Sequence, residues 1–116
     1  MPTNCPHLLV TVDGRQINDW QSFHDVFVVV FGLPPFYGRN MDAWVDCMTN
    51  LDDLSAGLSS VHAPEGGVVV LNIANARDMA KRVPEQYAAL VECSAFVNWR
   101  RMKRGAGPVL ALSFYD

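Results

Sequence analysis

Apolar residues recur along the chain with two different periods. Three short runs, rich in valine and leucine and flanked by turn-forming residues, are typical of strands. In four other segments the apolar residues stand three or four positions apart, which predicts amphipathic helices. The predicted strands are 7–12, 68–73 and 109–114, and the predicted helices begin after Asn18 and after Asn40, span 76–83, and run from 84 to about 102.

Local signals mark both ends of the first helix. Asn18 is its predicted N-cap, and Gly32, followed by Leu33 and two prolines, is its predicted stop. Residues 26–31 are also a β-branched and aromatic run that would suit a strand. We prefer a helix because the helical spacing begins before this run, at Trp20.

The order of these elements predicts an α/β fold. Strands separated by helical stretches pair in parallel and are joined by crossover helices. The nearly continuous apolar run 68–73 is the pattern of a strand buried on both faces, and the polar segment 55–67 is typical of a loop. The chain has 116 residues, which is enough for one core. We therefore predict a single domain over residues 1–116, with a small three-stranded parallel sheet packed with about four helices.

The charge of the chain is unevenly distributed. The net charge is only −3, which argues mildly against a dedicated nucleic-acid binder. Residues 40–76, however, carry five acidic side chains and no lysine or arginine, whereas residues 77–116 carry seven basic and four acidic side chains. This polarity indicates an acidic surface in the middle of the chain and a basic one near its end.

Composition excludes several other classes of protein. No apolar stretch approaches the roughly 20 residues that span a bilayer, and the first residues lack the basic-then-apolar pattern of a secretory signal. Cys5, Cys47 and Cys93 have neither CxxC nor Cys/His ligand spacing, so we expect free thiols in a reducing compartment. The expected location is therefore cytoplasmic, without a membrane segment.

A helix that begins after Asn40 would carry a narrow polar stripe. At 100° per residue, four polar side chains fall within about 60° of one another. They are Asp42, Asp46, Thr49 and Asp53, while Met41, Trp44, Val45, Met48 and Leu51 take the opposite side. Such a face is commonly a solvated one, and Asp near a helix N-terminus is favoured by the helix dipole. A surface for a cationic partner is the other interpretation, favoured by the lack of any basic residue between Arg39 and Arg77.

Residues 33–48, LPPFYGRNMDAWVDCM, resemble the barstar family of intracellular ribonuclease inhibitors. The shared pattern is Leu-Pro, two aromatic residues, Gly, any residue, Asn, any residue, Asp-Ala, two residues and Asp-Cys. The rest of the chain agrees with the family in the order of its elements. The resemblance implies a compact α/β fold with a three-stranded parallel sheet, which the apolar pattern predicts independently.

The resemblance also implies a mechanism and a set of contacts. In the family, the loop of this motif and the helix after it block the active site of a ribonuclease. By motif position, Asp46 would be the central carboxylate, standing where the enzyme expects a phosphate, with Asp42 a second acidic contact and Asn40 a polar contact and helix cap. The predicted partner-binding residues are Phe36, Tyr37, Gly38, Asn40, Asp42, Trp44, Asp46 and Asn50.

Two positions and one short stretch depart from the best-known member of the family. Phe36 stands where that member has tyrosine, and Val45 stands where it has tryptophan, although Trp44 is adjacent. The additional acidic contact on the last helix corresponds here to the basic stretch 98–101. Three targets therefore remain as alternatives: the ribonuclease that the best-known member inhibits, a different nuclease, or another toxin.

The remaining candidates for chemistry are weak. His7, His24 and His62 stand in no recognised nucleophile or metal-ligand arrangement, and Cys47 falls on the side of its helix away from the carboxylates, where we expect it to be buried. The pair Gly66-Gly67 precedes a strand, whereas a phosphate loop follows one. We therefore expect no enzyme, no metal and no cofactor.

These observations predict a stoichiometric protein inhibitor of the immunity or antitoxin type. Its partner would be a ribonuclease or nuclease toxin with a basic active site, bound by a monomer in a one-to-one complex. The alternative is a module of the same fold that binds RNA or a regulatory protein through the basic cluster 99–104. Cations at a helix C-terminus are also favoured by the dipole alone, and direct nucleic-acid binding is not expected.

Overall fold

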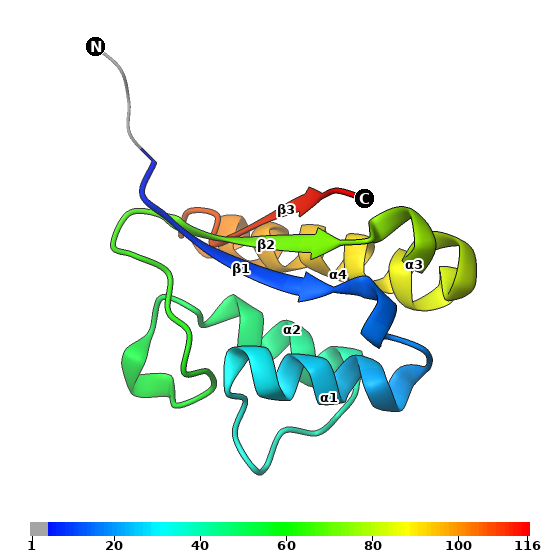
Figure 1. Ribbon diagram of the computed structural model, residues 1–116. Coiled ribbons are helices and arrows are strands. Elements are labelled where there is room, and N and C mark those ends of the chain that lie inside the picture. The colour runs from blue at the N-terminus through cyan, green and yellow to red at the C-terminus, as the bar shows by residue number, and fades with distance from the viewer. Residues whose placement is uncertain (1–4) are drawn as a thin grey trace.

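The computed structural model describes residues 5–116 and has the predicted order of elements (Figure 1). Two short 3-10 helices, η1 and η2, are added to the predicted strands and helices. The elements are β1 (His7–Asp13), η1 (Gly14–Gln16), α1 (Trp20–Phe31), α2 (Met41–Thr49), η2 (Leu54–Ala56), β2 (Val68–Ala74), α3 (Ala76–Arg82), α4 (Pro84–Lys103) and β3 (Leu110–Phe114). The predicted α/β fold with a three-stranded parallel sheet and four α-helices is confirmed.

The sheet has the order β1-β2-β3, and its helices lie on one side. Figure 1 shows α1 and α2 running beneath the strands, with α4 behind them. In the register, Val10 lies opposite Leu71, and Val69 lies opposite Leu110, so the apolar positions of the three strands share the face that the helices cover. The architecture is therefore two layers, one of strands and one of helices.

The expectation that β2 is buried on both faces is wrong. Val69, Leu71 and Ile73 are completely buried, but the alternate residues of β2 are only half-buried, and Leu9 beside them on β1 is exposed. The reason is that the helices cover one face alone, so the other face is sheltered only by side chains of neighbouring strands. A continuous apolar run does not distinguish a covered second face from an open one.

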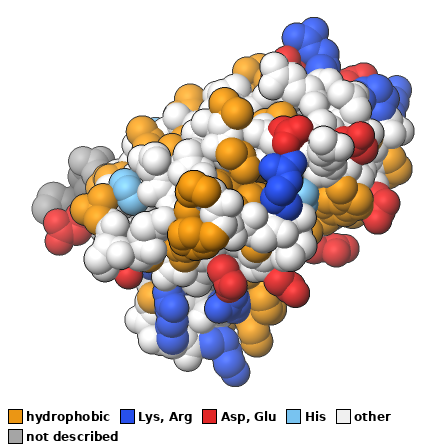
Figure 2. Space-filling view, turned by 90° about the horizontal axis from the view of Figure 1, so that it is seen from below, with side chains coloured by type: hydrophobic (Ala, Val, Ile, Leu, Met, Phe, Trp, Pro, Cys, Tyr) orange, Lys and Arg blue, Asp and Glu red, His pale blue; other side chains and the backbone are white. Residues whose placement is uncertain are grey.

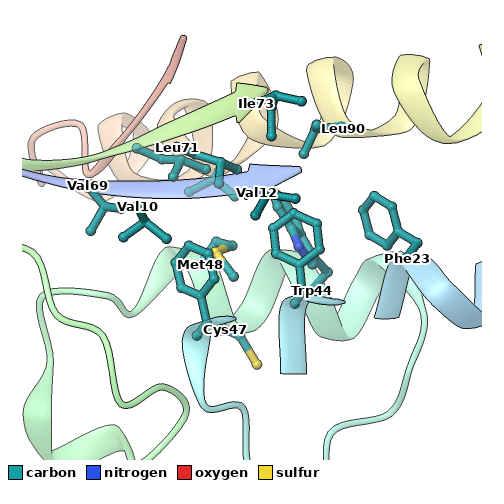
Figure 3. Packing of buried hydrophobic residues seen from close by; sticks show 14 of the residues in the cluster. Val10, Val12, Phe23, Trp44, Cys47, Met48, Val69, Leu71, Ile73 and Leu90 are labelled. Carbon is teal, nitrogen blue, oxygen red and sulfur yellow. The ribbon is translucent and has the colours of Figure 1, made fainter. Parts of the chain in front are cut away.

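The core lies between the two layers and is rich in aromatic residues. Phe23 and Phe27 of α1 pack beneath β1, and the ring of Phe27 meets Trp44 of α2 edge to face, with 5.6 Å between centroids. Figure 3 shows Trp44 and Met48 pointing from α2 toward Val10 and Val12 of the sheet. This packing fixes α2 through its apolar side, so the opposite side of α2 is left at the surface.

The ends of α1 show which local signals decided its length. Asp19, not Asn18, is the N-cap: its carboxylate accepts a hydrogen bond from the Ser22 backbone N–H at 2.7 Å, and the Ser22 hydroxyl completes a capping box. Asn18 instead accepts a hydrogen bond from Arg82 at 2.8 Å. Gly32 ends α1 as predicted, at φ 62°, a left-handed conformation that favours glycine.

Among the described residues, no helix is both long and apolar enough to cross a membrane.

Candidate protein-binding face

Asn40 sets the start of α2. Its side-chain oxygen accepts a hydrogen bond from the Ala43 backbone N–H at 2.8 Å, and its side-chain nitrogen donates to the Gly38 carbonyl at 3.3 Å. One amide thus caps the helix and holds the preceding loop against it. The predicted role of Asn40 as a helix cap is confirmed.

Tyr37 fastens that loop to α1 from the inside. The residue is only 7% exposed, and its hydroxyl lies 2.6 Å from Nδ1 of the buried His24. Burial raises the pKa of Tyr37 and lowers the pKa of His24, so burial favours the uncharged form of both side chains, which one hydrogen bond joins. Tyr37 was predicted to contact the partner, but its burial makes it a residue that positions the loop.

A second fastening holds the loop at Arg39, whose φ is 53°. Its guanidinium forms an ion pair with Asp25 of α1 and donates a hydrogen bond to the Gln21 carbonyl at 3.2 Å. With the loop tied at both points, Phe36 is left pointing outward, 73% exposed. A large aromatic side chain on a fixed loop is the kind of residue that anchors protein interfaces.

The polar stripe of α2 is shorter than predicted. The helix ends at Thr49, which is buried and whose hydroxyl donates to the Val45 carbonyl at 2.6 Å. Asn50 closes the helix, because its side-chain nitrogen donates to the Asp46 carbonyl at 2.8 Å. Asp53 lies beyond the end and caps η2 instead. Of the four predicted positions only Asp42 and Asp46 remain, one turn apart and exposed.

Trp44 does not lie on this face. Its side chain is completely buried against Phe27, which contradicts the prediction that it contacts a partner. The helical spacing predicts that Trp44 faces the sheet, whereas its position in the motif predicted a contact with the partner. The structure agrees with the helical spacing. We call the exposed set of Phe36, Gly38, Asn40, Asp42 and Asp46 the acidic face.

The acidic face is not free of basic neighbours. Arg100 of α4 donates a hydrogen bond to Asp46 Oδ1 at 2.9 Å, although the two residues are 54 positions apart. Arg101 reaches Asp52 just past the end of α2 with two hydrogen bonds of 2.9 Å each. Figure 2, which looks at the helix side of the molecule, shows acidic and basic side chains side by side. The lack of a basic residue between Arg39 and Arg77 therefore does not leave Asp46 and Asp52 without basic neighbours, because α4 supplies them.

A groove of about 260 Å³ lies between α2 and α4, next to the ion pair of Asp46 and Arg100. Its walls are Met41, Asp42, Val45 and Asp46 on α2 and Cys93, Phe96 and Arg100 on α4. Phe96 stacks on Trp99 with 5.5 Å between ring centroids, and the Lys103 ammonium lies 5.4 Å from the centroid of Trp99. We call Phe96, Trp99, Arg100 and Lys103 the aromatic-cationic stripe.

The aromatic-cationic stripe was only half anticipated. The basic cluster that begins at Trp99 is evident from the sequence, whereas its position beside α2 is not. The spacing of 96, 99, 100 and 103 was the available signal, because residues three and four apart share one face of a helix. That this face adjoins Asp46 follows only from the packing of the two helices.

Other chemistry is not assembled near the acidic face. No cluster of three His, Cys, Asp or Glu side chains that could hold a metal ion occurs in residues 5–116. Cys47 is buried as predicted, and burial, with a smaller effect of the Asp46 charge, raises the pKa of its thiol to about 11. The thiol is therefore protonated and unreactive.

A family model described as "Barstar (barnase inhibitor)" matches residues 7–110, from the start of β1 to the start of β3. The chain belongs to the Barstar family. The resemblance carried by residues 33–48 is thereby confirmed over nearly the whole domain. A family defined by inhibition of an enzyme also confirms the expectation that this member is not itself an enzyme.

A curated relative points in the same direction over a shorter stretch. The Bacillus subtilis protein named "Putative ribonuclease inhibitor YrdF" is 38% identical to this Barstar-family chain over 45 residues. The matched stretch covers 39% of this chain and 50% of the relative. The chain thus matches about half the length of that protein.

Proposed function

We propose that this member of the Barstar family is a stoichiometric protein inhibitor of a ribonuclease or nuclease-type toxin. The observation that carries the proposal is the pair of exposed carboxylates, Asp42 and Asp46, held one turn apart on a helix whose other side is buried in the core. The family description and the name of the Bacillus subtilis relative support the same role.

The acidic face would block a nuclease by taking the place of its substrate. A ribonuclease gathers arginine, lysine and histidine around the phosphate of RNA, and carboxylates are complementary to that cluster. Because α2 is anchored by Trp44 and Met48, its carboxylates are fixed before binding and lose little freedom on association. Opposite charges on the two surfaces also speed the encounter.

The residues around the two carboxylates would set their position. Asn40 fixes the first turn of α2 and Asn50 its last, while Tyr37 and Arg39 hold the loop that presents Phe36. Gly38 lies exposed between them and lets the loop approach a partner closely. The proposal includes a one-to-one complex, without a cofactor, that protects the cytoplasm of the cell that makes the nuclease.

The experiment is binding of the purified chain to barnase and to a panel of other bacterial ribonucleases, by calorimetry and by inhibition of RNA cleavage. Asp42→Asn and Asp46→Asn should each weaken binding by about 2 kcal/mol or more, the size of an interface hot spot. Asp53→Asn is the matched control, because it removes the same charge from a residue that caps η2 and lies off the face. The proposal fails if no nuclease binds at micromolar concentration, or if the Asp42 and Asp46 variants bind like the Asp53 control.

A further inference from the structure

In the free protein Asp46 already forms an ion pair with an arginine of the same chain, Arg100. The Arg100 guanidinium lies 2.9 Å from Asp46 Oδ1, and the two side chains are 38% and 61% exposed. A nuclease cation that approached Asp46 would meet Arg100 already in place. Since an exposed ion pair contributes little to stability, Arg100 is held weakly and is free to exchange.

The surface around Arg100 has the composition of an interface. Phe96 and Trp99 are 46% and 48% exposed, and their stacked rings stand on the same side of α4 as Arg100 and Lys103. Tryptophan and arginine are the residues most enriched at interface hot spots. Phe96 and Arg100 also line the groove that Asp42 and Asp46 line from the other side. The aromatic-cationic stripe is therefore continuous with the acidic face.

We propose that the aromatic-cationic stripe is the second half of the nuclease-binding face, and that Arg100 leaves Asp46 on binding to pair with a carboxylate of the nuclease. This inference rests on the proposed function. The nuclease would carry, beside its cationic active site, an acidic side chain opposite α4 and an apolar patch for Phe96 and Trp99.

Charge balance is the reason that the partner must supply a carboxylate. When a nuclease cation takes Asp46, the displaced Arg100 is left in a closing interface next to the cations of the active site. Without an acidic partner it would lose water and face like charges, and both effects oppose binding. Arg100 thus selects a nuclease with an acidic group opposite α4 and rejects one that has a cation there.

Single-stranded RNA is a poorer occupant of the stripe. A base would have to stack on Trp99, but Phe96 stacks on that ring and Lys103 approaches it. Asp42 and Asp46 also border the groove and would repel a phosphate backbone. We therefore treat RNA binding by the stripe as an alternative that the experiment below must exclude.

The experiment measures dissociation rates of complexes between the full chain and the ribonuclease panel, barnase included. For the nuclease that the unaltered chain binds most tightly, Arg100→Glu and Trp99→Ala should each raise the dissociation rate by about tenfold or more. Arg77→Glu is the matched control, because Arg77 on α3 forms an exposed ion pair with Asp116 at the same 2.9 Å. That variant should leave the dissociation rate unchanged. Arg100→Gln, which removes the charge without reversing it, should give a smaller rise.

The inference is overturned if Arg100→Glu and Trp99→Ala dissociate as slowly as the unaltered chain, or if Arg100→Glu dissociates more slowly. Loss of binding in Asp42→Asn with no change in Arg100→Glu would overturn this inference alone, whereas absence of binding to every nuclease would overturn the proposed function with it. Titration with single-stranded RNA at low and moderate salt completes the test. Tight RNA binding that Arg100→Glu abolishes would assign the stripe to RNA and also overturn the inference.

Discussion

Two neighbouring arginines of α4 reach the α2 region in opposite ways. Arg101 is 6% exposed in its side chain and donates to both oxygens of Asp52, to the Thr49 carbonyl at 2.8 Å and to the Gly107 carbonyl at 2.6 Å. Arg100, one residue earlier, is 38% exposed and donates a single hydrogen bond to Asp46. Arg101 thus joins α4 to the end of α2 and to the loop before β3, whereas Arg100 remains available at the surface.

The difference follows from what surrounds each guanidinium. A buried arginine must have its N–H groups satisfied, and two backbone carbonyls and a carboxylate do so for Arg101. Removal of such a cation leaves the carbonyl of the buried Thr49 without its donor. Water can replace the single hydrogen bond of Arg100, so its loss leaves no buried group unsatisfied. The comparison predicts that Arg101 stabilises the fold and that Arg100 acts mainly in binding.

The largest expected effect is that of Arg101→Met. Methionine fills part of the space but satisfies neither the Thr49 nor the Gly107 carbonyl, so the free energy of unfolding should fall by about 3 kcal/mol. Urea unfolding followed by circular dichroism measures the change. A loss below about 1 kcal/mol would mean that the two arginines do not differ in kind.

A smaller effect should appear in the dependence of stability on pH. The hydrogen bonds from Arg101 lower the pKa of Asp52 from its ordinary value of 3.8, with burial acting in the opposite direction. Because the folded-state pKa is depressed, this carboxylate contributes stability above pH 3.8 that is lost as the pH falls through the folded-state value.

Unfolding curves between neutral pH and pH 2 check this dependence. Asp52→Asn and Arg101→Met should each lose less stability on acidification than the unaltered chain, since neither retains the ionised pair. Asp13 should continue to contribute in both variants, because hydrogen bonds from Arg15 lower the pKa of its carboxyl to about 2. If the free energy of unfolding falls with pH equally in the variants and in the unaltered chain, the Arg101–Asp52 pair is not the cause of the acid dependence.

The smallest expected change is that of Arg100→Met on stability. An exposed ion pair contributes at most about 1 kcal/mol, so the free energy of unfolding should change by less than that amount. A double-mutant cycle with Asp46→Asn isolates the coupling between the two side chains. A coupling energy near 3 kcal/mol would make Arg100 a structural residue like Arg101 and would remove the basis for its exchange.

Much of the fold was predictable because its signals are local. The spacing of Phe23, Phe27 and Phe31 marked α1 even through a β-branched run, and Gly32 ended it as expected. The choice between Asn18 and Asp19 as N-cap was not settled by residue type, since both accept hydrogen bonds well. It was decided by the position of Ser22, which completes a capping box with Asp19, and by Arg82, which engages Asn18.

The sequence predicted which helix carries the candidate site but not which of its residues lie at the surface. The motif and the acidic block pointed to α2, where the structure exposes Asp42 and Asp46. Inclusion of Trp44 and Tyr37 followed motif position, which does not say whether a side chain points outward; both are buried. The length of the stripe was overestimated, because nothing in the helical spacing foretells that Asn50 closes α2.

The sequence by itself determined the order of strands and helices, the side of α2 that faces the core and the presence of an acidic segment. These properties depend on residues a few positions apart, whose relative placement is set by the geometry of one helix or strand. Only the tertiary structure decided which carboxylates have a basic neighbour. The Arg100–Asp46 pair joins positions 54 residues apart, and its formation depends on the packing of α4 against α2. The basic end of the chain therefore lies beside the acidic face, because helices distant in sequence bring side chains together only when they pack.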